Sequence, residues 1–135
     1  MTVLPVLTEN IAQVWPEIEP HLEAALAYSK GDYNVEHAKV YCTMGHWHVY
    51  VCVGAEDRVI GAAAVEFVNR PNDRVAFVVA IGGRLLTSQE RFEQFCTLLK
   101  TKGATKIEGA ARESAAKLWQ RFGFTEKYKI VEVSL

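Results

Sequence analysis

The chain has 135 residues, of which 50% are hydrophobic and 23% are charged. This length and composition are typical of one globular domain with a substantial buried core. The formal net charge of -1 provides no overall positive field, so we expect neither nucleic acid nor an anionic membrane as a partner.

The start of the chain predicts a strand followed by a helix. Residues 1–7 are apolar and suit a short strand. Asn10 can cap a helix in which apolar residues recur at helical spacing as far as Leu26. Pro16 and Pro20 lie inside this helix, and proline removes a backbone hydrogen bond and clashes with the preceding turn. We therefore expect a kink there, or two short helices.

The middle of the chain predicts one more helix and then three strands. Asn34 can cap the second helix, and Gly45 ends it. Residues 48–53 alternate between two faces and predict a strand, as do residues 59–69 after a short turn. Residues 75–81 are almost all apolar, which is typical of a central strand covered on both faces.

The last third of the chain predicts helix, strand, helix and strand. Thr87 and Glu90 form the pattern of a capping box at the start of a helix. A strand over residues 104–109, a helix over 113–122 and a final strand over 125–135 follow.

The predicted order is therefore β-α-α-β-β-β-α-β-α-β. Because a helix joins the strand at 75–81 to the strand at 104–109, these two strands should pair in parallel, whereas the earlier strands are joined by tight turns and should be antiparallel. The fold class is α/β, more narrowly α+β, with a mixed central sheet and helices on both faces.

The spacing of the cysteines and the hydropathy of the chain indicate the cellular compartment. Cys42, Cys52 and Cys96 are widely spaced and odd in number, which favours reduced thiols in a cytoplasm over a disulfide framework. No apolar run approaches the roughly 20 residues that cross a bilayer, and the apolar start is too short for a signal-peptide core. We expect a cytoplasmic protein without a membrane partner.

The last helix carries the motif that relates this chain to a family. Arg112 opens the helix, Ala115 and Leu118 follow, and Gly123-Phe124 leads into the final strand. Together with the element order, this segment resembles the GNAT superfamily of N-acetyltransferases. The resemblance implies one GNAT-like domain over residues 1–135. It also implies acetyl-CoA as the cofactor and a small-molecule or peptide amine as the acceptor.

The resemblance also implies a coenzyme-binding loop after the fourth strand. In the family, backbone amides of a glycine-rich loop cradle the pyrophosphate at a helix N-terminus. The positions that would do so here, with the arginine of the last helix, are Ile81, Gly82, Gly83, Arg84, Thr87, Ser88 and Arg112. The glycine spacing departs from the family pattern, and Glu90 near the helix start would repel a phosphate. A strand end with a tight turn explains Gly82-Gly83 equally well, and a solvated arginine explains Arg112 equally well.

The catalytic residues are also atypical. The family's acidic tyrosine is replaced by Trp119, whose indole donates a hydrogen bond but is not a usable acid, so packing is its expected role. Glu66 is a candidate general base, with a solvated strand carboxylate as the alternative. Tyr128 is a candidate acid, with plain packing as the alternative. His46 and His48 could form half a metal site, but no further ligands stand at a telling spacing, and no metal is expected.

Two functions remain open on these residues. One is an acetyl-CoA-dependent N-acyltransferase with an atypical cofactor loop and weak or absent activity. The other is a non-catalytic structural or interaction module that acts as a homo-oligomer or with a protein partner. Gly82-Gly83-Arg84 and Arg112 are similar to positions in small GNAT-like proteins of tailed phages and prophages. That likeness implies a role in phage assembly, in the cytoplasm of a bacterial host.

Overall fold

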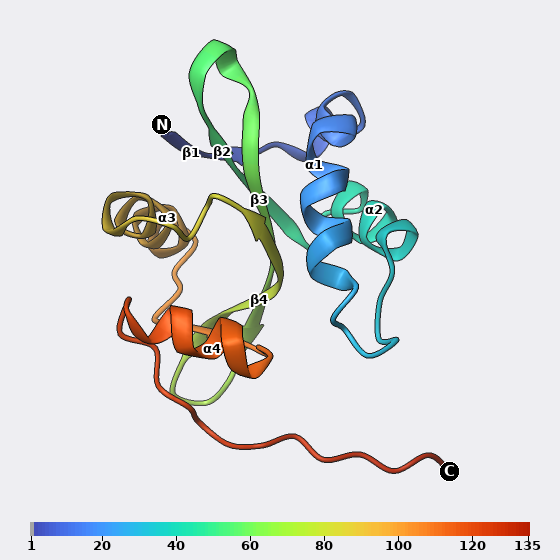
Figure 1. The fold of residues 1–135 in the computed structure, drawn as a ribbon, viewed down its shortest axis with the longest axis vertical. Helices are drawn as coiled ribbons and strands as arrows, with labels where there is room; N and C mark the ends of the chain where they lie inside the picture. Colours follow the sequence, from blue (N-terminus) through green and yellow to red (C-terminus); the bar gives the residue numbers. More distant parts are fainter. Residues whose placement is uncertain (1) are drawn as a thin grey trace.

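Five strands form one mixed sheet in the computed structural model, which describes residues 2–135 (Figure 1). Their order across the sheet is β1-β2-β3-β4-β5. The first four pair antiparallel with their neighbours, and β5 pairs in parallel with β4, as predicted. The strands are β1 (Thr2–Val6), β2 (His48–Val53), β3 (Val59–Asn69), β4 (Arg74–Gly83) and β5 (Lys106–Gly109).

Helices cover both faces of the sheet, which confirms the predicted layers (Figure 1). One core lies under α1 (Ile11–Leu26) and α2 (Val35–Thr43). The other lies under α3 (Gln89–Thr101) and α4 (Glu113–Gln120). Short 3-10 turns at Thr8–Asn10 and Ala55–Asp57 complete the elements. Within residues 2–135, no helix is long and apolar enough to cross a membrane.

The prediction of two short helices is wrong, because α1 is one helix from Ile11 to Leu26 that includes Pro16 and Pro20. The two rings are four residues apart on the exposed side of the helix. The carbonyls that lose their amide partners therefore lie on the solvent side, where water can satisfy them. The buried stripe that packs on the sheet is continuous and comprises Ile11, Trp15, Ile18, Leu22 and Leu26.

The predicted capping box at Thr87 is displaced by one residue. Helix α3 begins at Gln89, and its N-cap is Ser88, whose hydroxyl accepts a 3.2 Å hydrogen bond from the backbone N–H of Arg91. The Thr87 hydroxyl instead donates to the carbonyl of Arg84 at 2.9 Å. Two adjacent hydroxyl residues can each serve as a cap, and the turn before the helix decides between them.

The predicted final strand is also wrong for this structure. Residues 125–135 belong to no strand or helix and leave the domain as an exposed, extended segment (Figure 1). The alternation of apolar and polar residues suits a strand, but a strand exists only where a neighbour supplies its hydrogen bonds. The sequence pattern identified the conformation of this segment and not its partner.

Candidate functional site

The sheet opens between β4 and β5. The two strands pair from Val75↔Lys106 to Val78↔Gly109, and β4 then continues without β5 to Gly83. The register between β3 and β4 shifts at the same point, because Val65 pairs with Val78 and Ala64 pairs with Ala80. Bulges of this kind bend a strand and are frequent next to active sites. Beyond Val78, the β5 side of β4 therefore pairs with no strand of residues 2–135.

Trp119 packs at the end of the β4–β5 pairing on the side of α3 and α4. Its side chain is 9% exposed and belongs to the core on that side of the sheet. A Cβ atom on Gly109 would lie 2.8 Å from the Trp119 ring, so glycine is required where the indole crosses β5. The predicted packing role of Trp119 is confirmed, and its indole does not replace the family's acidic tyrosine.

The two glycines that end β4 are needed for packing against α1 and β3. A Cβ atom on Gly82 would collide with the backbone carbonyl oxygen of His21, and one on Gly83 would collide with the carbonyl oxygen of Ile60. Gly83 also has a φ of 69°, which favours glycine. The space on the Cβ side of each glycine is therefore filled by the protein itself. Gly82-Gly83 is therefore the closely packed strand end that the alternative interpretation expected.

The rest of the predicted loop is a folded turn rather than an open cradle. The backbone N–H of Arg84 donates to the carbonyl of Ile60 at 2.9 Å, so this amide is already used. Leu85 and Leu86 are buried in the core. The Arg84 side chain is the exposed cationic group that the turn presents. The Arg84 amide is thus unavailable to a coenzyme diphosphate, whereas the Arg84 side chain is available to one.

Replacing Gly82 with alanine should therefore destabilise the protein by roughly 1–3 kcal/mol, the usual cost of overpacking. The new methyl group meets the backbone of α1, which cannot rotate away. Urea unfolding measures this change. Gly54→Ala is the matched control, because its Cβ would meet only the flexible side chain of Ile60 at 3.1 Å. Equal stability of the Gly82→Ala and wild-type proteins would contradict the packing role.

A pocket of about 220 Å³ opens beside the diverging strands, on the face that α1 and α2 cover. Glu66 of β3 pairs with Phe77 of β4, one residue before the pairing with β5 ends. Trp47 is buried beneath two tyrosine rings, whose centroids lie 5.1 Å (Tyr33) and 4.8 Å (Tyr41) from its own. The residues that line the pocket are Tyr33, Tyr41, His46, Trp47 and Glu66.

The pocket carries negative charge next to its aromatic rings. Burial, followed by the charges of Asp32 and Glu66, raises the pKa of Tyr33, so its hydroxyl stays protonated at neutral pH. The carboxylate of Glu66 is exposed, and in residues 2–135 no cationic side chain forms an ion pair with it. Aromatic faces and a carboxylate without a cation are the groups that bind an organic ammonium.

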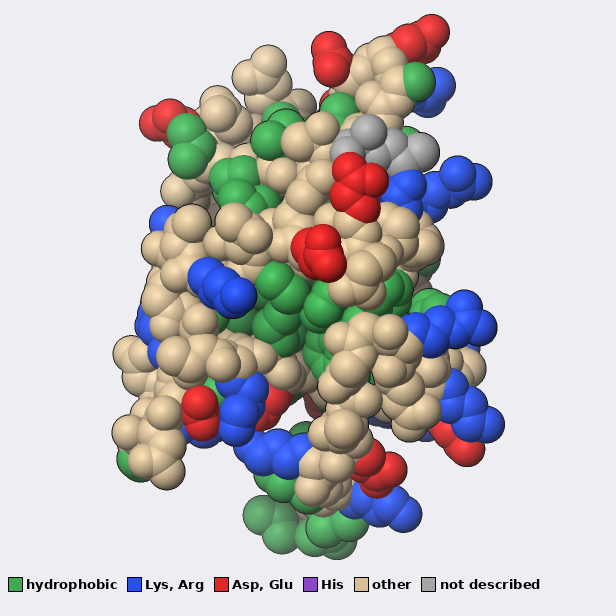
Figure 2. Space-filling model, turned by 90° about the vertical axis from the view of Figure 1, so that its left-hand side faces the viewer, with side chains coloured by type: hydrophobic (Ala, Val, Ile, Leu, Met, Phe, Trp, Pro, Cys, Tyr) green, Lys and Arg blue, Asp and Glu red, His purple; other side chains and the backbone are tan. Residues whose placement is uncertain are grey.

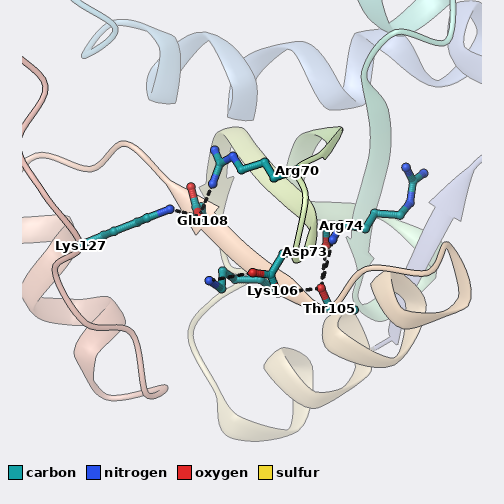
Figure 3. A network of polar contacts seen from close by, with 7 residues as sticks. All are labelled: Arg70, Asp73, Arg74, Thr105, Lys106, Glu108 and Lys127. Atoms are coloured by element: carbon teal, nitrogen blue, oxygen red, sulfur yellow. Dashed lines mark hydrogen bonds and ion pairs between the residues drawn. The ribbon is translucent and has the colours of Figure 1, made fainter.

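Glu108 of β5, two strands away from Glu66, is a carboxylate that does have cationic partners (Figure 3). Its carboxylate binds Arg70 of the β3–β4 turn and Lys127 of the C-terminal segment, and these two cations lower its pKa. In the same network, Lys106 followed by Thr105 lowers the pKa of Asp73. These ion pairs fasten the β3–β4 turn to β5. The carboxylate of Glu108 is thus occupied, whereas that of Glu66 is available to a ligand.

The second candidate anion-binding arginine, Arg112, lies at the start of α4. It is the N-cap residue of α4, and its guanidinium lies 3.9 Å from the ring centroid of Tyr28, which follows α1. This cation–π contact joins the C-terminal end of α1 to the start of α4. The Arg112 side chain remains exposed and can meet an anion there.

Tyr128 lies on the exposed C-terminal segment, where its side chain is 60% exposed, and it does not line the pocket of Glu66. The structure thus separates the two candidate catalytic residues. The role of Tyr128 as an acid stays a prediction.

The histidines and cysteines lie in separate packing environments. The His48 ring packs edge-on against Phe67 with centroids 4.9 Å apart, while His46 lies beside Tyr41. Across residues 2–135, no three metal-ligating side chains gather at one place. The cysteines are free thiols, and burial raises the pKa of Cys42 to about 12. Such a thiol is a packing residue and a poor nucleophile.

The sequence prediction therefore located part of the site. It singled out Glu66 and the turn at residues 81–88, but it missed the aromatic wall formed by Tyr33, Tyr41 and Trp47. These three residues come from the loop before α2, from α2 and from the turn before β2, so no sequence period connects them. A signal did exist, because aromatic residues are frequent between residues 33 and 50.

No protein-family model and no curated protein sequence matches this chain. Solved structures do. The chain is similar to a protein described as a probable acetyltransferase, with 15% identity, a TM-score of 0.69 and coverage of 100% of this chain and 97% of that one. It is also similar to a tetramutant of the BH1408 protein of Bacillus halodurans, with 13% identity, a TM-score of 0.70 and full coverage of both chains.

A third similar structure is an aminoglycoside acetyltransferase from an uncultured soil metagenomic sample, in complex with sisomicin. It has 11% identity, a TM-score of 0.69 and coverage of 99% of this chain and 94% of that one. At these identities the likeness concerns the fold. The predicted fold class, a GNAT-like mixed sheet with helices on both faces, is confirmed.

Proposed function

We propose that this chain, whose fold is that of the GNAT-type acetyltransferases, slowly transfers an acetyl group from acetyl-CoA to a cationic amine. The observation that carries the proposal is the position of Glu66. Its carboxylate has no cationic partner within residues 2–135 and lies in an aromatic pocket next to the point where β4 and β5 diverge.

The pocket suits an amine that arrives as an ammonium ion. The rings of Tyr33 and Tyr41 can contact the cation through their faces, and Glu66 can accept its hydrogen bonds. Only a neutral amine is a nucleophile, so Glu66 would then accept a proton from the ammonium. The similar aminoglycoside acetyltransferase, in complex with sisomicin, supports a small-molecule amine as the acceptor, and a peptide amine would present the same group.

The coenzyme would be held more loosely than in a protein with a glycine cradle. Bound acetyl-CoA supplies an activated thioester. The arm of the coenzyme would lie beside the unpaired end of β4 beyond Val78, whereas the Cβ sides of Gly82 and Gly83 are filled by the protein and leave no room there for a diphosphate. The exposed side chains of Arg84 and Arg112 would bind the anionic groups instead. Because positioning can account for about 7–11 kcal/mol of a barrier, a loosely held coenzyme implies slow turnover.

Calorimetric titration with acetyl-CoA tests these contacts. Arg84→Ala and Arg112→Ala should each weaken binding by about tenfold or more, since a hydrogen bond to a charged group contributes about 1.5–3 kcal/mol. Arg58→Ala is the matched control, because this exposed arginine follows the Ala55–Asp57 turn at the β2–β3 hairpin, outside the proposed contacts. The assignment fails if all four proteins bind equally or if none binds.

A second candidate is a non-catalytic module that has kept the fold, with a phage-assembly role among the possibilities that the sequence raised. The packed glycines and the buried Trp119 favour it, because both replace catalytic features with packing. Such a protein would bind no acetyl-CoA in the same titration. We propose a cytoplasmic location for the protein under either function.

A further inference from the structure

An aromatic ring of the loop between α1 and α2 packs on one of the two arginines proposed to bind the coenzyme. Tyr28 lies in this loop, which spans residues 27–34, and the guanidinium carbon of Arg112 lies over its ring, 3.9 Å from the centroid. The loop and the start of α4 lie side by side (Figure 1). The Tyr28 side chain is 58% exposed, so core packing does not account for its position.

This contact leaves the hydrogen-bond donors of Arg112 available. The distance of 3.9 Å is that of two carbon atoms in van der Waals contact, which leaves no room for an N–H group between the guanidinium and the ring. The five N–H groups of a guanidinium lie in its plane and point outward. Across residues 2–135, no carboxylate forms an ion pair with Arg112, and its side chain is exposed. The ring therefore holds the face of the guanidinium while the edge can meet phosphate oxygens.

The loop itself fixes the position of Tyr28. The backbone N–H of Tyr28 donates to the carbonyl of Ala25 at 3.2 Å. The Ser29 hydroxyl then closes the turn, because it donates to the carbonyl of Tyr33 at 2.9 Å and accepts from the backbone N–H of Tyr33 at 3.4 Å. Gly31, with a φ of 86°, allows the chain to reverse there. Since these bonds involve the backbone and Ser29, the turn does not depend on the Tyr28 ring.

An anionic ligand of this protein depends on individually placed cations. The net charge is -1, and Lys and Arg side chains are scattered among Asp and Glu over the face that α3 and α4 cover (Figure 2). An arginine that becomes ordered only when its ligand binds loses rotamer freedom, and this loss lowers the affinity. An arginine that is already ordered in the free protein avoids most of this loss.

We propose that Tyr28 is a positioning residue for the coenzyme, because its ring holds Arg112 in the orientation in which the guanidinium edge binds a phosphate of acetyl-CoA. The inference rests on the proposed function, in which Arg112 is one of two arginines that bind the anionic groups of the coenzyme. Tyr28 acts through Arg112, and the face of its ring is the part that matters. Phenylalanine offers the same face to a cation.

Calorimetric titration with acetyl-CoA tests this role. The Tyr28→Ala protein should bind about threefold to tenfold more weakly than the wild type, the usual effect of one long side chain that must be ordered on binding. Tyr28→Phe is the matched control, since it keeps the ring, and it should bind like the wild type. In the Arg112→Ala protein, adding Tyr28→Ala should cause no further loss, because the ring then has nothing to orient. Circular dichroism checks that the variants fold.

The outcomes separate the positioning role from the coenzyme assignment. If Arg112→Ala weakens binding but Tyr28→Ala does not, the positioning role is overturned and the assignment of Arg112 stands. An equal loss from Tyr28→Ala with and without Arg112 would overturn the role too, because Tyr28 would then act independently. A Tyr28→Phe protein as weak as Tyr28→Ala would show that the hydroxyl acts and not the ring face, against the proposal. A wild type that binds no acetyl-CoA would overturn both the role and the assignment.

Discussion

Glu66→Gln is expected to lower kcat/KM for amine acetylation by about 10²–10⁴-fold, the usual contribution of a general base. Glutamine keeps the size of the side chain but cannot accept a proton, and it removes the charge that attracts the ammonium. Both kcat and KM should change, because the same carboxylate binds and deprotonates the amine. Release of free thiol from acetyl-CoA, followed over a range of diamine concentrations, measures these constants.

Glu56→Gln is the matched control for this prediction. Glu56 is an exposed carboxylate in the β2–β3 hairpin turn and does not line the pocket. Its activity should equal that of the wild type. Equal activity of the Glu66→Gln protein would show that Glu66 is only a solvated strand carboxylate, which is the alternative that its sequence position left open.

Phe95→Ala is expected to destabilise the protein by about 3–5 kcal/mol, because it leaves a cavity in the core beneath α3. The side chain is 1% exposed and packs edge-on against Tyr50, with ring centroids 5.5 Å apart. Urea unfolding should show a lower midpoint, while the slope of the unfolding free energy against urea concentration stays unchanged. Phe92→Ala, at a half-buried position in the same helix, should cost less. A loss below about 1 kcal/mol for Phe95→Ala would contradict its place in the core.

Much of the fold could be predicted because the spacing of the apolar residues changes from helical to alternating where a helix gives way to a strand. The alternation over residues 48–53 predicted a strand with two distinct faces, and in the structure Val49 and Val51 lie in the core with α1, whereas Tyr50 and Cys52 lie in the core with α3. The parallel pairing of β4 and β5 followed from the helix that joins them. The prolines of α1 misled the prediction, because propensity alone does not say that both rings face solvent.

The site was harder to predict because its residues are brought together only by the fold. Gly82-Gly83 has the composition of a phosphate loop, but the close approach of α1 at His21 explains it. That approach depends on the angle between a helix and a sheet, which no local pattern encodes. The final segment has a clear strand pattern, but sequence alternation does not reveal which chain supplies the partner.

The central proposal is that the pocket of Glu66 accepts an amine for acetylation at the diverging strands. The most direct test is free-thiol release from acetyl-CoA by the wild-type protein, measured with diamines, peptide N-termini and neutral or acidic amines. We predict slow but saturable turnover that prefers cationic amines such as the diamines over neutral or acidic amines, and that requires about tenfold more acetyl-CoA in Arg84→Ala and Arg112→Ala. No thiol release with any amine, together with no binding of acetyl-CoA, would contradict the proposal and favour a non-catalytic module.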